Sequence, residues 1–232
     1  MGLFSSFQKN RAARKLRDAH ETYEKLHAEW KKESDTLDGY ITVVRDCAEG
    51  RIADQLVDTS DYGFLLNEGE MPVAYMPGTL FLEVVRAPSS YSGGYGGVSF
   101  PLFGRVRVNT GRMGGKVTPG DESIKWTDEG TTMITTERIM FTGAKRTQEW
   151  KFAKMMSITH HAPGYSIFAV SGKSKPTGIG FGPDVATEVQ FRIELAAAIA
   201  RNQLPRYLAE LEAEKAKHDA EMPVPPVPPA LP

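Results

Sequence analysis

The side chains best suited to acid–base or metal chemistry are the adjacent histidines His160 and His161. They precede the turn Ala162-Pro163-Gly164, at the end of a run that predicts a strand. Neighbouring residues of a strand point to opposite faces, so the two imidazoles are poorly placed to share one metal ion. We interpret the pair as structural residues beside a turn, and we expect no metal site.

The other histidines and the single cysteine offer no better chemistry. His20, His27 and His218 lie in charged segments without carboxylates or thiolates at ligand spacing, which predicts solvent-exposed side chains. Cys47 falls on an apolar stripe, and no nucleophile elbow is present, so a packing role is favoured. One cysteine also excludes an intrachain disulfide and a multi-cysteine zinc site.

Two glycine-rich stretches lack the features of a phosphate loop. Ser92–Gly97 leads into a strand-like run instead of a helix. Gly178–Gly182 does precede a helix, which Asp184 is expected to cap, but the Lys-Ser/Thr ending is missing and Asp184 would repel an anion. We therefore expect no nucleotide cofactor, and an enzyme is the least favoured class of function.

Basic residues gather on three of the predicted hairpins. They are Arg105, Arg107, Arg112, Lys116, Lys145, Arg146, Lys173 and Lys175. If the hairpin tips lie at one rim, they form an anion-binding surface for a lipid headgroup or a phosphopeptide. The alternative is that charges on hairpin edges prevent sheets of different molecules from pairing.

The N-terminus combines apolar and basic residues without any acid. The apolar residues Leu3, Phe4 and Phe7 precede the basic residues Lys9, Arg11, Arg14, Lys15 and Arg17. This composition is typical of a short segment at the surface of an anionic membrane, and Met1–Ser6 also fits the pattern for myristoylation of Gly2. A solvated helix start is the alternative interpretation.

A heptad pattern follows, with apolar residues at alternating spacings of four and three. Its larger members are Leu16, Tyr23, Leu26, Trp30, Leu37, Tyr40 and Val44, which we call the α-seam; Ala12, Ala19 and Cys47 continue the pattern, and Glu33 interrupts it. One interpretation is an amphipathic helix, or a helical hairpin broken near Ser34 and Gly39, packed on its own domain. The other is an intermolecular coiled coil that makes the protein a homo-oligomer.

Beyond Gly50 the pattern changes to short apolar runs separated by turn residues, which predicts about ten strands. After Pro183, apolar residues at helical spacing predict a closing helix, which Pro205 interrupts. The predicted fold is α+β and mainly β: a partly open antiparallel β-barrel or sandwich, capped by a C-terminal helix and preceded by an N-terminal helix or helical hairpin. The predicted parts are residues 1–53 (helical), 64–202 (β domain with capping helix), 203–221 (charged helical extension) and 222–232 (proline-rich tail).

The composition and the tail limit the partners. The formal net charge of -1 gives no general attraction to nucleic acid, and the absence of long apolar runs favours a cytoplasmic protein. Met222–Pro232 is rich in proline and predicts an extended tail, which is either disordered or a docking peptide for a protein partner.

One segment resembles a known family. Gly130–Lys145 is similar to the G-x-hydrophobic-x-hydrophobic-T-x-x-R-hydrophobic-x-F-x-G hairpin of bacterial PH-like and GRAM-like domains. Trp150–Met155, Ser157–His160 and Ile167–Lys175 look like an uncharacterised bacterial family of this kind, so the resemblance covers about residues 64–200. It implies a partly open barrel of seven or so strands with a capping helix, usually without catalytic residues. It also implies that Arg138 fixes the hairpin, and that the surplus strands are an insertion or a separate sheet.

These expectations define three classes of function. The first is a non-catalytic PH-like binding or scaffold module that self-associates and lies at the inner face of the membrane, on anionic lipid. The second is a cytoplasmic assembly or adaptor protein, of the kind found in phages or prophages, that acts through its coiled coil and its tail. The third is an enzyme of unknown type.

Overall fold

The computed structural model describes residues 2–52, 63–86, 93–102, 106–115, 122–161, 164–173 and 175–227. Side chains are described within 13–52, 63–85, 123–161, 164–173 and 175–227. The chain forms two compact units, of which one combines Met1–Val43 with Leu208–Pro232 and the other is Val44–Tyr207.

The N-terminal segment is a single helix, α1 (Gly2–Ala48). Of the two predicted alternatives, a single helix or a helical hairpin, the structure has the single helix, since Ser34 and Gly39 both lie inside it. Each of these residues weakens a helix by no more than about 1 kcal/mol, and the surrounding helix formers outweigh that cost. A methyl group added at Gly39 would meet nothing within 4 Å.

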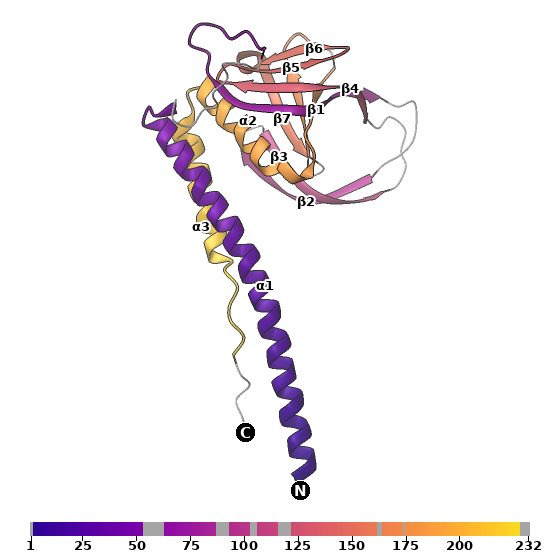
Figure 1. Ribbon diagram of the computed structural model, residues 1–232, viewed down its shortest axis with the longest axis vertical. Helices are drawn as coiled ribbons and strands as arrows, with labels where there is room; N and C mark the ends of the chain where they lie inside the picture. Colours follow the sequence, from indigo (N-terminus) through magenta and orange to yellow (C-terminus); the bar gives the residue numbers. More distant parts are fainter. Residues whose placement is uncertain are drawn as a thin grey trace. The chain divides into compact units, whose positions relative to one another are not determined.

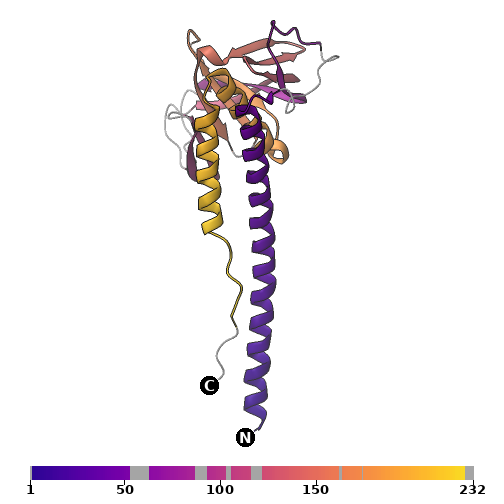
Figure 2. The same ribbon diagram turned by 90° about the vertical axis from the view of Figure 1, so that its left-hand side faces the viewer.

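The second helix of this unit belongs to α3 (Leu204–Ala220) and lies beside α1 in both views (Figures 1 and 2). His218 stacks on Trp30, with ring centroids 5.4 Å apart and planes 3° from parallel. The indole N–H of Trp30 donates to the His218 carbonyl at 2.9 Å, and His218 Nε2 bonds to the Trp30 carbonyl at 2.9 Å. The prediction of an exposed His218 is therefore wrong, because reciprocal bonds hold its ring between the helices.

The β-rich unit contains one mixed sheet (Figure 1). Its described strands are β1 (Pro72–Arg86), β2 (Gly93–Leu102), β3 (Val106–Gly115), β4 (Glu122–Thr135), β5 (Arg138–Gly143), β6 (Thr147–Lys151), β7 (Met155–His161), β8 (Tyr165–Val170) and β9 (Thr177–Gly180). Their order is β2-β3-β7-β8-β9-β1-β4-β5-β6. The predicted α+β, mainly β class is confirmed. The sheet is open and not closed into a barrel, because β2 and β6 are its two edges and do not pair with each other.

Seven of these strands, from β7 to β6 in the sheet order, pair antiparallel throughout. The hairpin β2–β3 lies between β1 and β4 in sequence and joins the sheet through a parallel pairing of β3 with β7. The hairpin is therefore part of the same sheet, and the alternative of a separate sheet is wrong.

Aromatic side chains form the core on one face of the sheet. Trp150 of β6 lies 5.8 Å from Phe81 of β1 and 5.1 Å from Phe168 of β8, measured between ring centroids. The sheet must curve strongly for strands so far apart in its order to share one core. A register shift between Phe81 and Leu82 lets these neighbours both be buried, although a regular strand would turn them to opposite faces.

The helix α2 (Ala186–Ala200) follows β9 after a single 3-10 turn, η3 (Pro183–Val185). Asp184 lies in that turn and caps neither helix, so the predicted N-cap is wrong. At the other end Asn202 has a φ of 55°, and Gln203 N–H donates to the Ala198 carbonyl at 2.8 Å, as in a Schellman C-cap. The predicted break before Pro205 is confirmed, since α3 begins at Leu204.

Candidate functional site

An arginine at the β4–β5 turn holds the segment that precedes the sheet. Arg138 Nε and Nη2 donate to the two carboxylate oxygens of Glu70, each at 2.9 Å. Its Nη1 donates to Glu149 at 2.8 Å, and Nη2 also donates to the Leu65 carbonyl at 2.9 Å. Four of the five N–H donors of the Arg138 guanidinium are thus used within the protein.

The Glu70 carboxylate is fully satisfied. Besides Arg138, it accepts hydrogen bonds from the Thr135 hydroxyl at 2.6 Å and from the Asn67 backbone N–H at 2.8 Å. Burial alone would raise the pKa of Glu70, but the bonds from Arg138, Asn67 and Thr135 outweigh it and lower this pKa. The network is therefore strongest when Glu70 is ionised.

A second polar network lies in the core. His160 Nδ1 bonds to the Ser166 hydroxyl at 2.7 Å, and His160 Nε2 bonds to Glu194 Oε1 of α2 at 2.7 Å. The three residues are no more than 2% exposed. A nucleophilic serine must reach its substrate, and Ser166 is enclosed, so this triad ties α2 to β7 and β8. The second oxygen, Glu194 Oε2, is buried without a hydrogen-bond partner among the described residues.

The two histidines face opposite ways, as predicted. His161 turns away from the core and stacks on Tyr165, with ring centroids 4.4 Å apart. Its two ring nitrogens are buried and have no hydrogen-bond partner among the described residues. Burial, and to a smaller extent the neighbouring His160, lower the pKa of His161 to about 4. His161 is therefore neutral near pH 7.

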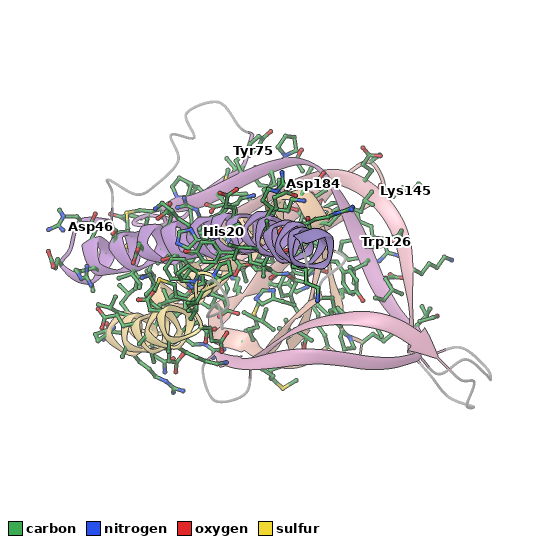
Figure 3. The ribbon with its side chains drawn as sticks, turned by 90° about the horizontal axis from the view of Figure 1, so that it is seen from below. His20, Asp46, Tyr75, Trp126, Lys145 and Asp184 are labelled. Atoms are coloured by element: carbon green, nitrogen blue, oxygen red, sulfur yellow. The ribbon has the colours of Figure 1, made fainter. Side chains whose placement is uncertain are left out.

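An exposed tryptophan, Trp126, lies next to the stacked His161 and Tyr165 rings and is labelled in Figure 3. Trp126 meets Tyr165 edge to face at 6.0 Å and is 47% exposed. A Cβ at Gly180 would lie 2.4 Å from the indole, so only glycine lets Trp126 lie directly on β9. No local pattern in the sequence singles out Trp126, because its neighbours come from strands distant in sequence.

Two of the predicted basic hairpins meet at one end of β1. Glu83 pairs with Arg146 of the β5–β6 turn at 2.5 Å, and it lies opposite Lys125 on β4 and Thr177 on β9. Val84 N–H donates to the carbonyl of Pro176 in the β8–β9 connection. These contacts bring both turns to the same end of the strands.

We call the exposed cationic residues around this end the basic rim. They are Lys125, Lys145, Arg146, Lys154, Lys173 and Lys175. Three acids, Glu83, Asp128 and Glu129, lie among them, so the basic residues are in excess. Arg146 pairs with Glu83 and lies over the Phe81 ring at 5.3 Å.

Other predicted basic and membrane-contact residues fall partly outside the described residues. Arg105 and Lys116 lie outside them, and Arg107 and Arg112 are described only as backbone of β3. Leu3, Phe4, Phe7, Lys9 and Arg11 are described only as backbone of α1, whereas Arg14, Lys15 and Arg17 are exposed on this helix.

The α-seam divides into two parts. Val44 and Cys47 are buried in the β-rich unit at 0% and 2% exposure, and Ile41 is 7% exposed. Burial raises the pKa of the Cys47 thiol, consistent with the predicted packing role. Leu16, Tyr23, Trp30, Leu37 and Tyr40 are half-buried, and Leu26 is 51% exposed.

The described residues contain neither a candidate metal cluster nor a candidate membrane-spanning helix. Within the described ranges, no group of three or more His, Cys, Asp or Glu side chains could hold a metal ion. No helix in the described part of the chain is long and apolar enough to cross a bilayer. Comparisons with protein-family models, curated proteins and solved structures gave no match.

The Arg138 network predicts a specific acid sensitivity. Arg138→Ala should lower the free energy of unfolding at pH 7 by about 3 kcal/mol, because it leaves a buried carboxylate unpaired. The lowered pKa of Glu70 means that this contribution is present above the ordinary value of 4.5 and is lost as pH falls through the folded-state pKa. The difference between wild type and variant, measured by denaturant titration, should therefore shrink below pH 4.5.

Arg146→Ala is the matched control, because its ion pair with Glu83 is 44% exposed on the arginine side and should contribute less than about 1 kcal/mol. Equal losses in the two variants would contradict a special role of Arg138.

A second prediction concerns His161. Its lowered pKa means that the unfolded chain binds a proton between pH 6.5 and about 4 that the folded protein does not, so folding stability falls as pH drops through this range. His161→Phe keeps a ring on Tyr165 and cannot be protonated. The variant should therefore be more stable than wild type at pH 5, by a larger margin than at pH 8. Thermal unfolding at the two pH values measures both differences. An equal difference at both would refute the lowered pKa of His161.

Proposed function

We propose that the chain is a non-catalytic scaffold, in which a PH-like binding domain is joined to a helix that associates with a second copy of the chain. The observation that carries this proposal is the first part of the α-seam, in which Leu16 and Tyr23 are half-buried and Leu26 is 51% exposed. A PH-like assignment is supported by the seven antiparallel strands followed by α2, and by Arg138, which fixes the hairpin that motivated the resemblance.

The seam before Trp30 is not covered by the second helix. The named contacts that join α1 to α3 begin at Trp30 and continue to Asp38, which Lys215 approaches at 3.5 Å. Beyond α3 the chain from Met222 to Val227 has neither helix nor strand. Met222, Val224 and Val227 are 51%, 80% and 81% exposed, so these side chains do not cover the seam.

A helix with this pattern is stabilised by a helical partner. Most helical stability in proteins comes from packing of the apolar face, and an unpaired stretch in water is marginal. Residues at alternating spacings of four and three interlock with the same pattern on another helix. A second copy of α1 is the partner that supplies this pattern.

The first test uses two substitutions that introduce the same charge. Leu26→Glu places a carboxylate in the seam, whereas Ala28→Glu places it on the outer side of the same helix. Each copy of a pair would bury a carboxylate in the first variant, so its dissociation constant should rise about a hundredfold, with no change in the second. Sedimentation equilibrium measures both; a wild type that is monomeric at every concentration would rule out self-association.

The basic rim supports a second function of the same scaffold, attachment to an anionic membrane surface. Five lysines and Arg146 gather at one end of the sheet, and each basic residue near such a surface adds about 1 kcal/mol to binding. The predicted membrane-contact segment is consistent with this function, because α1 begins at Gly2 and is helical there.

The test of the rim is a charge reversal. Lys145→Glu combined with Lys175→Glu should weaken binding to phosphatidylserine vesicles about tenfold or more in a flotation assay at low salt. Lys25→Glu combined with Lys32→Glu makes the same change in net charge on α1 and serves as the control. If the two pairs weaken binding equally, only net charge matters and the rim is not a site.

A further inference from the structure

We infer that two copies of the chain pair antiparallel through residues 15–29 of α1, with Lys15 of one copy beside Glu29 of the other. This inference rests on the self-association proposed above and adds the orientation and register of the two helices. Three independent features of α1 lead to it: the distribution of charge, the sizes of the seam residues, and the positions that flank the seam.

Charge along this part of α1 is segregated by sign. The basic residues Lys9, Arg11, Arg14, Lys15 and Arg17 come first, and the acids Asp18, Glu21, Glu24 and Glu29 follow, interrupted only by Lys25. A parallel pair would set the two basic stretches side by side and repel. An antiparallel pair sets the basic stretch of one copy beside the acidic stretch of the other, which is attractive.

The sizes of the seam residues indicate the register. Ala12, Leu16, Ala19, Tyr23, Leu26 and Trp30 occupy successive seam positions. In a parallel pair each residue meets itself, so alanine layers leave voids while tyrosine and tryptophan layers are crowded. In the antiparallel register Leu16 meets Leu26 and Ala19 meets Tyr23, so these layers have similar volumes.

The same register fixes the flanking pairs. Lys15 and Glu29 both occupy the heptad position just before a seam residue, Leu16 and Trp30 respectively, and both are exposed. In the antiparallel arrangement these positions face each other, so the pair forms twice by symmetry. On one helix, or in a parallel pair, Lys15 and Glu29 would be about 20 Å apart, beyond the range of a screened charge.

The proline tail is the alternative occupant of the seam within the chain. Met222 to Val227 contains three prolines at Pro223, Pro225 and Pro226, which cannot supply the repeating helical pattern that the seam matches. A second copy of α1 supplies it.

The test is a charge-swap cycle on the full chain, read as the dissociation constant from sedimentation equilibrium. Lys15→Glu and Glu29→Lys should each weaken association about fivefold, because two attractive pairs become repulsive. The double variant should return to within about twofold of wild type, since the pairs are restored with reversed sign. Lys25→Glu changes the same charge away from the flanking positions and should have little effect, and circular dichroism confirms that each variant keeps its helix.

The outcomes separate the two claims. If the wild type associates but the effects of the two single variants add in the double variant instead of cancelling, the antiparallel register is overturned. Self-association itself is then still supported. A wild type that stays monomeric overturns both. Loss of association on removing Met222–Pro232, without coupling between positions 15 and 29, would assign the seam to the tail and also overturn the inference.

Discussion

The hydrogen bond between His160 and Glu194 is the interaction that fixes the closing helix of the β-rich unit. An open sheet leaves part of its core uncovered, and α2 covers it with buried residues that include Ile193, Leu195 and Ala196. Apolar contacts of this kind tolerate sliding, whereas a buried carboxylate loses its partner if the helix moves. The bond of Glu194 to His160, and through it to Ser166, therefore selects one placement of α2.

Polar networks serve the same purpose elsewhere in the unit. Arg138 joins Glu70, Glu149 and the Leu65 carbonyl, and so attaches the chain that enters β1 to the β4–β5 turn. Both networks are built from residue types that also serve in catalysis, yet their polar atoms bond to one another, with Glu194 Oε2 the exception among the described atoms. Among the described residues of the unit, the lysines of the basic rim and Trp126 are exposed to solvent.

Local patterns predicted much of this structure. The heptad spacing predicted α1, short apolar runs predicted most strands, and the opposite orientations of His160 and His161 followed from strand geometry. The sequence allows both a single helix and a hairpin broken near Ser34 and Gly39; the structure has the single helix, because helix propensity is a weak preference over so long a helix. Asp184 was expected to cap a helix, but the chain enters α2 through a 3-10 turn instead.

Contacts between distant residues could not be predicted in this way. The partner of Arg138 is 68 positions earlier, and that of His160 is 34 positions later. One signal was present: Glu194 is a lone acid among the apolar residues Ile193, Leu195 and Ala196, which indicates a buried partner. The parallel pairing of β3 with β7 has no signal of this kind, because it depends on how the whole sheet curves.

The central place of β1 has a consequence for how the chain acquires its fold during synthesis. β1 is the first strand to leave the ribosome, but its neighbours are β4 and β9, and β9 is the last strand of the sheet in sequence. Pairings over such separations form slowly, because a long loop must close before the contact stabilises it. One edge of β1 therefore has no pairing strand, and Phe81 and Leu82 stay uncovered, until Gly180 has been translated. The nascent chain passes through a stage in which this long strand needs protection from other chains.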